Sequence, residues 1–403
     1  MPRPLFVTGT ARSGSNLLAR MLSAHGDAMV ACDPFFPLFP SLRNVIMLSS
    51  PDPRLRSSFD PSSPLDDYYF SDQRLRIMDA IQAGDLHGPF HPSDWDRVRE
   101  AVVGRMKHEC ADLVPHLDGM LGGTHKEIFD NGLAIITKGR NAQNRSWVGF
   151  KEVWIVEFFA SLAQAYPEAR FIVLLRDPRA VIASMQAMDR LDVSQIAHTL
   201  SYARHWRKYV AFARHYGGDS GLAHRLMVVT YERLVTEPHK TARELCDFLE
   251  VEFDGGMLDP GRYVDYSTGG TWRGNSSFAP TLSKISDEQR ERWRTHIEPR
   301  ALRLVEFVCG PEMRLAGYEP VSDADSTDPG PEVLDYMIEN GRQPCSWRSD
   351  LGDPQLDYGF ELFRRALLSA AEESLDSQLI RRSFLFEEVF RAIRQCLMST
   401  QRV

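Results

Sequence analysis

The stretch PLFVTGTARSGSNLLARML, residues 4–22, decides the fold of this chain. An apolar run over residues 5–7 leads into a loop of small residues, 9–15, and an amphipathic helix is expected to follow to about Ala24. The order of strand, glycine loop and helix predicts a phosphate cradle, because consecutive backbone N–H groups and the N-terminus of the helix converge on an anion.

The loop lacks the lysine of the nucleotide triphosphatases. In their motif, G-x-x-x-x-G-K-[ST], the lysine reaches the terminal phosphates and a hydroxyl holds Mg²⁺. Gly9 and Gly14 have the spacing of that motif, but Ser15 and Asn16 occupy the positions of the lysine and the hydroxyl residue. The only cation in the loop is Arg12. The sequence therefore predicts a phosphate-binding loop that does not serve ATP hydrolysis.

The composition is that of an ordinary globular protein. The 403 residues are 43% hydrophobic and 25% charged, with a formal net charge of −8, so nucleic acid is not expected as a partner. The six cysteines are scattered without C-x-x-C spacing, which favours reduced thiols. We expect no secretory leader and no membrane span, and hence a cytoplasmic location unless the chain has been separated from an anchor.

Strand and helix signals alternate along most of the chain, with one long excursion. Residues 51–70 predict an irregular loop and residues 71–121 mostly helix, so we treat 51–146 as a mostly helical insertion that shapes the ligand pocket. Beyond it, the expected elements are strands at 147–151, 169–175 and 225–231 and helices at 155–166, 179–188, 194–216, 238–250 and 286–308.

These signals predict an α/β fold of the P-loop type. A central parallel sheet would be flanked by helices and would carry the helical insertion and a helical C-terminal extension. The expected main domain covers 1–320, followed by a linker over 321–331 and the extension over 332–403, with helices at 357–374 and 377–398. The extension offers helices through which the chain could form an oligomer.

Four segments together resemble the sulfotransferases that use 3′-phosphoadenosine 5′-phosphosulfate (PAPS), over roughly residues 4–318. They are TGTARSGSNLLARML (8–22), GFKEVW (149–154), RFIVLLRDPRAVIASM (170–185) and VVTYERLVTEP (228–238). The arginine form of the loop looks like the Golgi carbohydrate and tyrosylprotein branches more than the lysine form of the cytosolic arylsulfotransferases. The resemblance implies transfer of a sulfuryl group from PAPS to a hydroxyl of a sugar, a small metabolite or a tyrosine, with no metal required.

The resemblance also implies which residues bind the donor. Arg176, at the end of a strand, and Ser184, in the next helix, match the element that holds the 3′-phosphate, and a bidentate arginine suits that charge. A structural Arg176–Asp177 ion pair is the alternative. For Trp272, in a late glycine-rich loop, the resemblance implies stacking on adenine, and a plain solvated loop is the alternative. The expected donor-binding set is Thr10, Ala11, Arg12, Ser13, Gly14, Ser15, Asn16, Arg176, Ser184, Tyr231, Arg273, Gly274, Asn275 and Ser276.

Three residues are candidates for catalysis. Arg12 and Lys151, the latter expected to end a strand, would neutralise charge on the bridging oxygen and the transferring SO₃. Asp33 stands at the spacing from Arg12 at which the tyrosylprotein branch carries a catalytic glutamate, and we expect its apolar neighbours to raise its pKa toward that of a useful general base. The aspartate departs from that pattern, so Glu152 and His25 remain alternative bases.

Two other classes of function remain open at the level of sequence. One is a small-molecule kinase with an altered phosphate loop, and the other is a non-catalytic nucleotide-binding scaffold. The acceptor is not identified by a motif. Aromatic residues that would suit a sugar or a tyrosine are Phe35, Phe36, Phe39, Tyr68 and Trp154.

Overall fold

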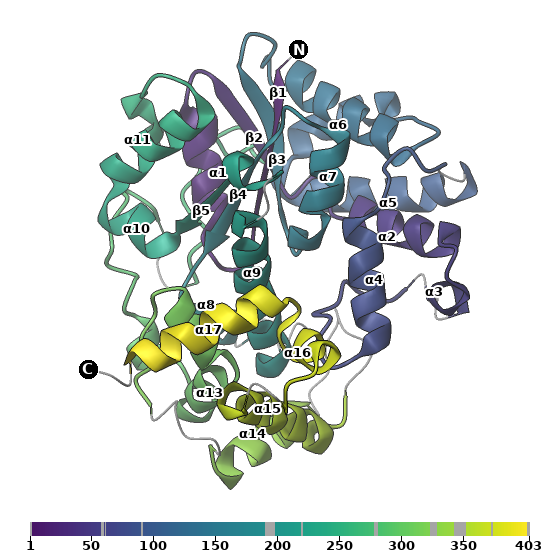
Figure 1. The fold of residues 1–403 in the computed structure, drawn as a ribbon. Coiled ribbons are helices and arrows are strands. Elements are labelled where there is room, and N and C mark those ends of the chain that lie inside the picture. Colours follow the sequence, from purple (N-terminus) through teal and green to yellow (C-terminus); the bar gives the residue numbers. More distant parts are fainter. Residues whose placement is uncertain are drawn as a thin grey trace. The chain divides into compact units, whose positions relative to one another are not determined.

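A computed structural model gives the fold, drawn in Figure 1. It describes residues 2–57, 60, 62–89, 92–189, 198–218, 221–277, 281–322, 329–341, 352–371 and 374–400. The chain forms two compact units. The first comprises Met1–Ser62, Ile77–Leu175 and Ser220–Asp287, and the second comprises Ser63–Arg76, Arg176–Asp219 and Glu288–Val403. The domain boundaries expected near residues 320 and 332 stay predictions.

The first unit is built on a five-stranded sheet in the order β2-β3-β1-β4-β5. The strands are β1 (Arg3–Gly9), β2 (Ala28–Cys32), β3 (Trp147–Val153), β4 (Arg170–Leu175) and β5 (Leu226–Thr230). Every neighbouring pair is parallel, which confirms the expected α/β class. Gly9 is level with Val153 on one side and Leu174 on the other. The carboxyl ends of the three central strands therefore meet at one edge, where such sheets bind ligands.

Two apolar layers cover this sheet. On one face, Leu5 and Val7 of β1 share a core with α1 (Ser15–Ala24), α10 (Tyr231–Thr236) and α11 (Pro238–Leu249). On the other face, phenylalanine rings of three strands pack against rings from α2 (Leu38–Ser49), α6 (His125–Gly139) and α7 (Phe159–Ala165). The rings of this aromatic face include Phe6, Phe35, Phe39, Phe129, Phe150, Phe159 and Phe171. Phe35 and Phe39 are fully buried there. The expectation that these two rings line an acceptor pocket is therefore wrong.

The strand register separates two neighbouring charged residues. Successive side chains of a strand point to opposite faces of the sheet. Lys151 is level with Val7 and so belongs to the face covered by α1, whereas Glu152 is level with Thr8 and belongs to the aromatic face. The expected end of this strand at Lys151 is wrong, because β3 continues to Val153.

The insertion is mostly helical, as expected. It contains α3 (Pro53–Ser57), α4 (Asp72–Gln82), α5 (Pro92–Glu109), a 3-10 segment η1 (Ala111–Gly119) and α6. The other short 3-10 segments are η2 (Val156–Phe158), η4 (Ala223–Arg225), η5 (Gly255–Leu258) and η6 (Pro260–Arg262). β2 and α2 were not among the expected elements.

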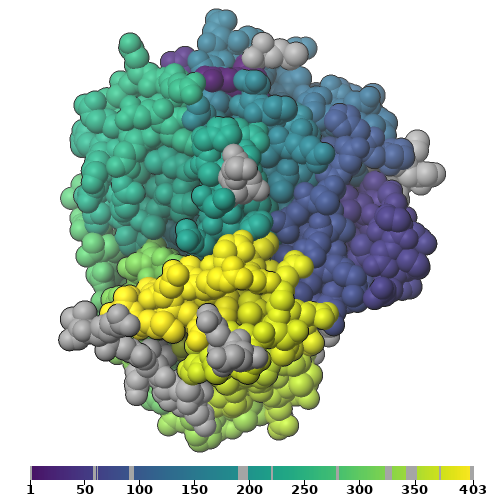
Figure 2. Space-filling view, viewed as in Figure 1, coloured from purple at the N-terminus to yellow at the C-terminus, as the bar shows by residue number. Residues whose placement is uncertain are grey.

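The second unit is helical. Its helices are α8 (Pro178–Asp189), α9 (Thr199–Gly218), α12 (Trp293–His296), α13 (Pro299–Leu315), α14 (Pro331–Gly341), α15 (Pro354–Ser369), α16 (Ser377–Phe384) and α17 (Glu387–Thr400). The single helix expected over 286–308 is wrong, because Pro299 starts a new helix at its first turn. The single helix expected over 377–398 is also wrong, since Leu385 interrupts it with a φ of 66°. Figure 2 shows α16 and α17 in yellow on the surface of this unit.

Buried ion pairs tie α9 to the C-terminal helices. Glu361 of α15 accepts hydrogen bonds from Arg204 Nε at 2.8 Å and Arg207 Nη1 at 2.7 Å, and Arg364 pairs with Glu312 of α13. All five side chains are at most 2% exposed. The described part of the expected C-terminal extension thus supplies interior residues of the second unit.

Candidate active site

The loop between β1 and α1 turns at two residues in the left-handed conformation. Arg12 has a φ of 62° and Gly14 a φ of 92°, and a non-glycine residue in this region is costly and often marks a functional site. Ser13 N–H donates to Thr10 O at 3.2 Å, and Leu18 N–H donates to Gly14 O at 3.2 Å. The loop therefore folds back on itself immediately before the N-terminus of α1.

Two hydroxyls in this loop are buried and lack a hydrogen bond. Among the described residues, Thr10 Oγ1 and Ser13 Oγ have no partner, and both side chains are buried. Buried hydroxyls nearly always have a partner. Two unsatisfied hydroxyls beside the positive end of a helix fit a phosphate-sized anion.

Arg12 connects the phosphate loop to the late loop of the first unit. Its Nη2 donates to Asn275 O at 2.6 Å and to Ser277 Oγ at 2.8 Å. Gly274, with a φ of 95°, turns the late loop beside this contact. The other expected donor-binding residues of the unit are distributed around these two loops: Ser15 and Asn16 are buried, Ala11 is half-buried, Arg273 and Ser276 are exposed, and the ring of Tyr231 packs on Gly14.

Asp33 forms an ion pair with Lys151 at the carboxyl edge of the sheet. Asp33 directly follows β2 with a φ of 49°, its N–H donates to Lys151 O at 2.7 Å, and its Oδ2 accepts from Lys151 Nζ. Nη2 of Arg105, on α5, lies 3.4 Å from Asp33 Oδ1. The structure thus brings two of the three expected catalytic residues into contact.

The expectation that apolar neighbours raise the pKa of Asp33 is wrong. Burial alone would raise it, but the charges of Lys151 and Arg105 outweigh burial and hold the pKa of Asp33 below its usual value. Burial likewise acts to lower the pKa of Lys151, and the charge of Asp33 reverses this and raises it. Asp33 is therefore ionised and Lys151 is charged at neutral pH.

Glu152 is a second carboxyl in this cluster. Its side chain is 0% exposed, Oε1 accepts from Phe35 N–H, and Oε2 has no hydrogen-bond partner among the described residues. Burial, and then the negative charge of Asp33, raise the pKa of Glu152 to about 8. The two carboxyls are thus in opposite protonation states near neutral pH.

Three charged residues of this site were not predicted from the sequence: Arg20, Arg105 and Glu109. Glu109, at the end of α5, accepts hydrogen bonds from Asn16 Nδ2 at 3.4 Å and Arg20 Nη2 at 3.3 Å. The guanidinium of Arg20 lies 5.7 Å from the ring centre of Trp272. That ring is 7% exposed and belongs to the apolar core of this unit. Stacking of Trp272 on adenine stays a prediction.

His25 is held by two hydrogen bonds that leave it no role as a base. Asp27 N–H donates to His25 Nδ1 at 2.9 Å, and His25 Nε2 lies 2.8 Å from Glu252 O. Since Nδ1 accepts, Nε2 must carry the proton and donate it to the carbonyl. The imidazole therefore fastens the end of α1 to the loop before η5.

Arg176 and Ser184 belong to the second unit. Arg176 follows the last residue of β4 directly, is 8% exposed, and accepts a hydrogen bond at its carbonyl from Trp206 Nε1 at 2.7 Å. Asp177, the alternative partner of Arg176, forms an ion pair with Arg179 at 2.7 Å. Ser184 is buried in α8. A role for both in binding the 3′-phosphate stays a prediction.

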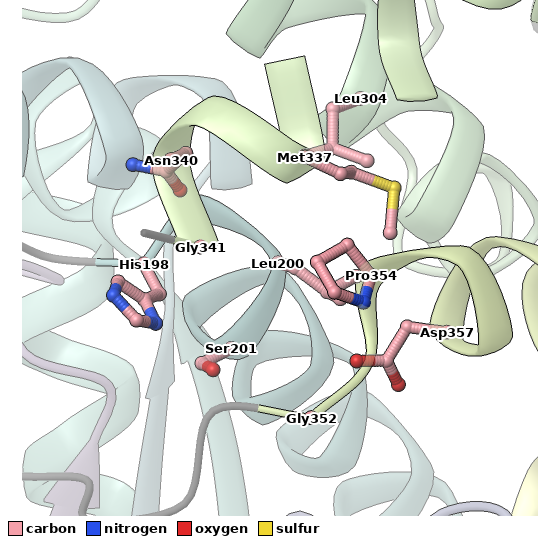
Figure 3. A pocket seen from close by; sticks show the side chains of 10 residues that line it. All are labelled: His198, Leu200, Ser201, Leu304, Met337, Asn340, Gly341, Gly352, Pro354 and Asp357. Atoms are coloured by element: carbon pink, nitrogen blue, oxygen red, sulfur yellow. The ribbon is translucent and has the colours of Figure 1, made fainter. Parts of the chain in front are cut away.

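The second unit also contains a pocket that holds none of the expected site residues. Figure 3 shows side chains from α9, α13, α14 and α15 around it. Its described lining is His198, Leu200, Ser201, Leu304, Met337, Asn340, Gly341, Gly352, Pro354 and Asp357. Asp357 is engaged by Arg204 in an ion pair at 2.6 Å. The pocket therefore borders the buried ion pairs of this unit.

Three features are absent from the part of the chain that the structure describes. In that part, no helix is both long and apolar enough to cross a membrane. The same residues hold no group of three or more His, Cys, Asp or Glu side chains placed for a metal ion. The five cysteines that are described form no disulfide, and Cys345 lies outside the described residues.

Comparison with known proteins gives one family match. Residues 4–255 match the model described as "Sulfotransferase family". The chain is 28% identical to carbohydrate sulfotransferase 3 of Tetronarce californica over 50% of this chain and 49% of that protein. It is 25% identical to protein-tyrosine sulfotransferase 1 of Danio rerio over 55% and 63%. The chain thus spans about half the length of the curated relatives it matches.

Solved structures similar to the chain include a sulfotransferase domain from the curacin biosynthetic pathway. It aligns with 79% of this chain and 99% of its own, at 16% identity and a TM-score of 0.44. A sulfotransferase domain from the Synechococcus PCC 7002 olefin synthase aligns with 78% and 95%, at 20% identity and a TM-score of 0.42.

Proposed function

Because the chain belongs to the sulfotransferase family, we propose that it transfers the sulfuryl group of PAPS to a hydroxyl of an acceptor. The observation that carries the proposal is the phosphate loop: its only cation is an arginine, and Thr10 Oγ1 and Ser13 Oγ are buried without a partner among the described residues. An anionic ligand with phosphate oxygens satisfies both hydroxyls and the N-terminus of α1.

The donor supplies an activated sulfuryl group with a phosphate as its leaving group. Residues 10–16 would hold the 5′-phosphosulfate, with Tyr231 and the late-loop residues Arg273, Gly274, Asn275 and Ser276 beside it. Arg176 and Ser184 would bind the 3′-phosphate. The hydrogen bond from Arg12 to Asn275 O is the contact that supports the proposal that the late loop covers this site.

Three side chains would act on the reacting groups. Lys151 and Arg12 stabilise the charge that develops on the bridging oxygen and the sulfuryl group. Asp33 accepts the proton of the acceptor hydroxyl, and its ion pair with Lys151 keeps it ionised and ready to accept. Lys151 moves its charge from Asp33 toward the sulfuryl group as Asp33 becomes neutral.

The acceptor that we propose is a carbohydrate, a small metabolite or a tyrosine hydroxyl. Relatives named for carbohydrate and for protein-tyrosine transfer both match, so the class of acceptor is open between them. The insertion would shape its pocket, because α5 places Arg105 next to Asp33. A cytoplasmic location, independence of metal and assembly through the C-terminal helices also stay part of this proposal.

Ligand-dependent thermal stability tests the proposal against its alternatives. Adenosine 3′,5′-bisphosphate in the presence of EDTA should stabilise the chain by about 2.7 kcal/mol at one hundred times its Kd. A kinase would be stabilised by Mg-ATP instead. A scaffold that binds neither nucleotide would show no change in thermal stability. Transfer of labelled sulfate from PAPS to a polysaccharide, a tyrosine peptide or a phenol then identifies the acceptor class. A chain that ignores the bisphosphate overturns the proposal.

A further inference from the structure

Glu152 is fully buried, in surroundings that disfavour an ionised carboxylate at neutral pH. One oxygen accepts from Phe35 N–H and the other has no partner among the described residues. The side chain lies on the aromatic face, next along the strand to Phe150 on that face. A carboxylate in such surroundings loses its hydration and gains only one donor, Phe35 N–H, so the neutral acid is favoured.

The charges around Glu152 are few and identifiable. Asp33 approaches from the end of β2, Arg105 from α5, and Lys151 is its neighbour in β3; the elements on the aromatic face contribute rings. When Glu152 is neutral, the net charge of Lys151, Arg105 and Asp33 is +1. When Glu152 is ionised, the net charge of the four residues is zero, and each of the two cations can pair with a carboxylate.

We propose that Glu152 is a positioning residue that holds a proton so that the charge of Lys151 stays available to the transferring sulfuryl group. This inference rests on the proposed function and adds to it. Glu152 is then neither the base nor an idle core residue. When Glu152 ionises at alkaline pH, kcat falls. The fall arises because Glu152 then competes for the charge of Lys151, and the donor-binding loop is not involved.

The pH dependence of kcat tests the inference in the full chain. A buried pKa of about 8 predicts that kcat of the unaltered protein falls about tenfold per pH unit above that value. Glu152→Gln keeps an oxygen for Phe35 N–H and cannot ionise, so its kcat should stay within about twofold over the same range. Glu339→Gln, at a 59% exposed side chain outside the site, is the matched control and should keep the alkaline fall.

An infrared measurement tests the proton without any substrate. The difference spectrum between about pH 7 and pH 9 should contain the carbonyl band of a protonated carboxyl. That band should be absent in Glu152→Gln and present in the control variant Glu339→Gln. Asp33→Asn removes the negative neighbour and should move the transition to lower pH, which keeps the test available if Glu152→Gln does not fold.

Three outcomes would overturn the inference. One is a missing carbonyl band, which would mean that Glu152 is ionised at neutral pH. Another is an alkaline fall in kcat that persists in Glu152→Gln. The third is a Glu152→Gln variant that binds bisphosphate normally but is inactive at every pH, which would make Glu152 the base. A normal band in a chain that binds no bisphosphate would instead defeat the proposed function.

Discussion

Tyr231 lies against the backbone of Gly14 so closely that no side chain fits between them. A Cβ at Gly14 would lie 2.5 Å from Tyr231 Cδ2, and Gly14 has a φ of 92°. Glycine is therefore required here by conformation and by space. The contact fixes the phosphate loop, at the start of α1, against the first turn of α10.

Gly14→Ala should weaken binding of adenosine 3′,5′-bisphosphate by at least about tenfold, since strain of about 1–3 kcal/mol has to be relieved by moving the loop. Isothermal titration calorimetry measures the change. Gly26→Ala is the matched control, because a Cβ there meets nothing within 4 Å. Equal affinity of the two variants would show that the loop does not hold the ligand.

Asp33→Asn should lower kcat by about 10²–10⁴-fold and leave the affinity for the bisphosphate nearly unchanged, because the amide cannot accept the proton. Steady-state kinetics with labelled PAPS and calorimetry separate the two quantities. Asp118→Asn, at a side chain that is 92% exposed, should alter neither. Unchanged turnover in Asp33→Asn would place the base elsewhere.

Arg176→Ala should weaken binding of the bisphosphate by about tenfold to a hundredfold, the value of one or two hydrogen bonds to a charged group. The affinity for adenosine 5′-phosphate, which lacks the 3′-phosphate, should hardly change. Calorimetry with both nucleotides gives the comparison. If both ligands lose affinity equally, Arg176 supports the fold of the site and does not read the 3′-phosphate.

Glu361→Gln should lower the free energy of unfolding of the second unit by about 3–5 kcal/mol at neutral pH, because Arg204 and Arg207 lose a buried partner. Urea unfolding followed by fluorescence and circular dichroism measures the change. Glu339→Gln, at a 59% exposed side chain paired with Arg300, should cost less than about 1 kcal/mol. Similar losses in both variants would contradict this account.

The same residue predicts a loss of stability in acid. Burial acts to raise the pKa of Glu361, but Arg207 and Arg204 outweigh it and lower the pKa from 4.5 to about 2. A lowered pKa stabilises the fold above the unfolded value, and this contribution disappears as pH falls from about 4.5 toward about 2. The difference between the unaltered protein and Glu361→Gln should therefore narrow over that interval in urea unfolding.

The sequence predicted the parts of the fold that have local signals. The strand, loop and helix over residues 4–22, and the strand that ends before Arg176, each have an apolar run and a glycine or Asp-Pro boundary. β2 was missed because its five residues, AMVAC, have no alternation. That omission hid how Asp33 reaches Lys151, since β2 pairs with β3 and places Cys32, the residue before Asp33, level with Lys151.

The electrostatics of the site could not be read from the sequence. Arg105 reaches Asp33, and Glu109 reaches Arg20, from a helix more than seventy residues away in the chain. The apolar neighbours of Asp33 suggested a raised pKa. Lys151 and Arg105, which are far from Asp33 in the sequence, lower that pKa instead. Only the four-residue spacing of Asn16 and Arg20 hinted that both lie on one side of α1.

Glu109 accepts hydrogen bonds from two residues of α1 while it terminates the longest helix of the insertion. This double contact limits how the protein can diversify. We expect related proteins with other acceptor substrates to differ at the start of α5 and in the segments before it. A change in the last turn of α5 would also disturb the phosphate loop. Recruitment of new substrates should therefore leave Glu109 in place and alter the surfaces farthest from it.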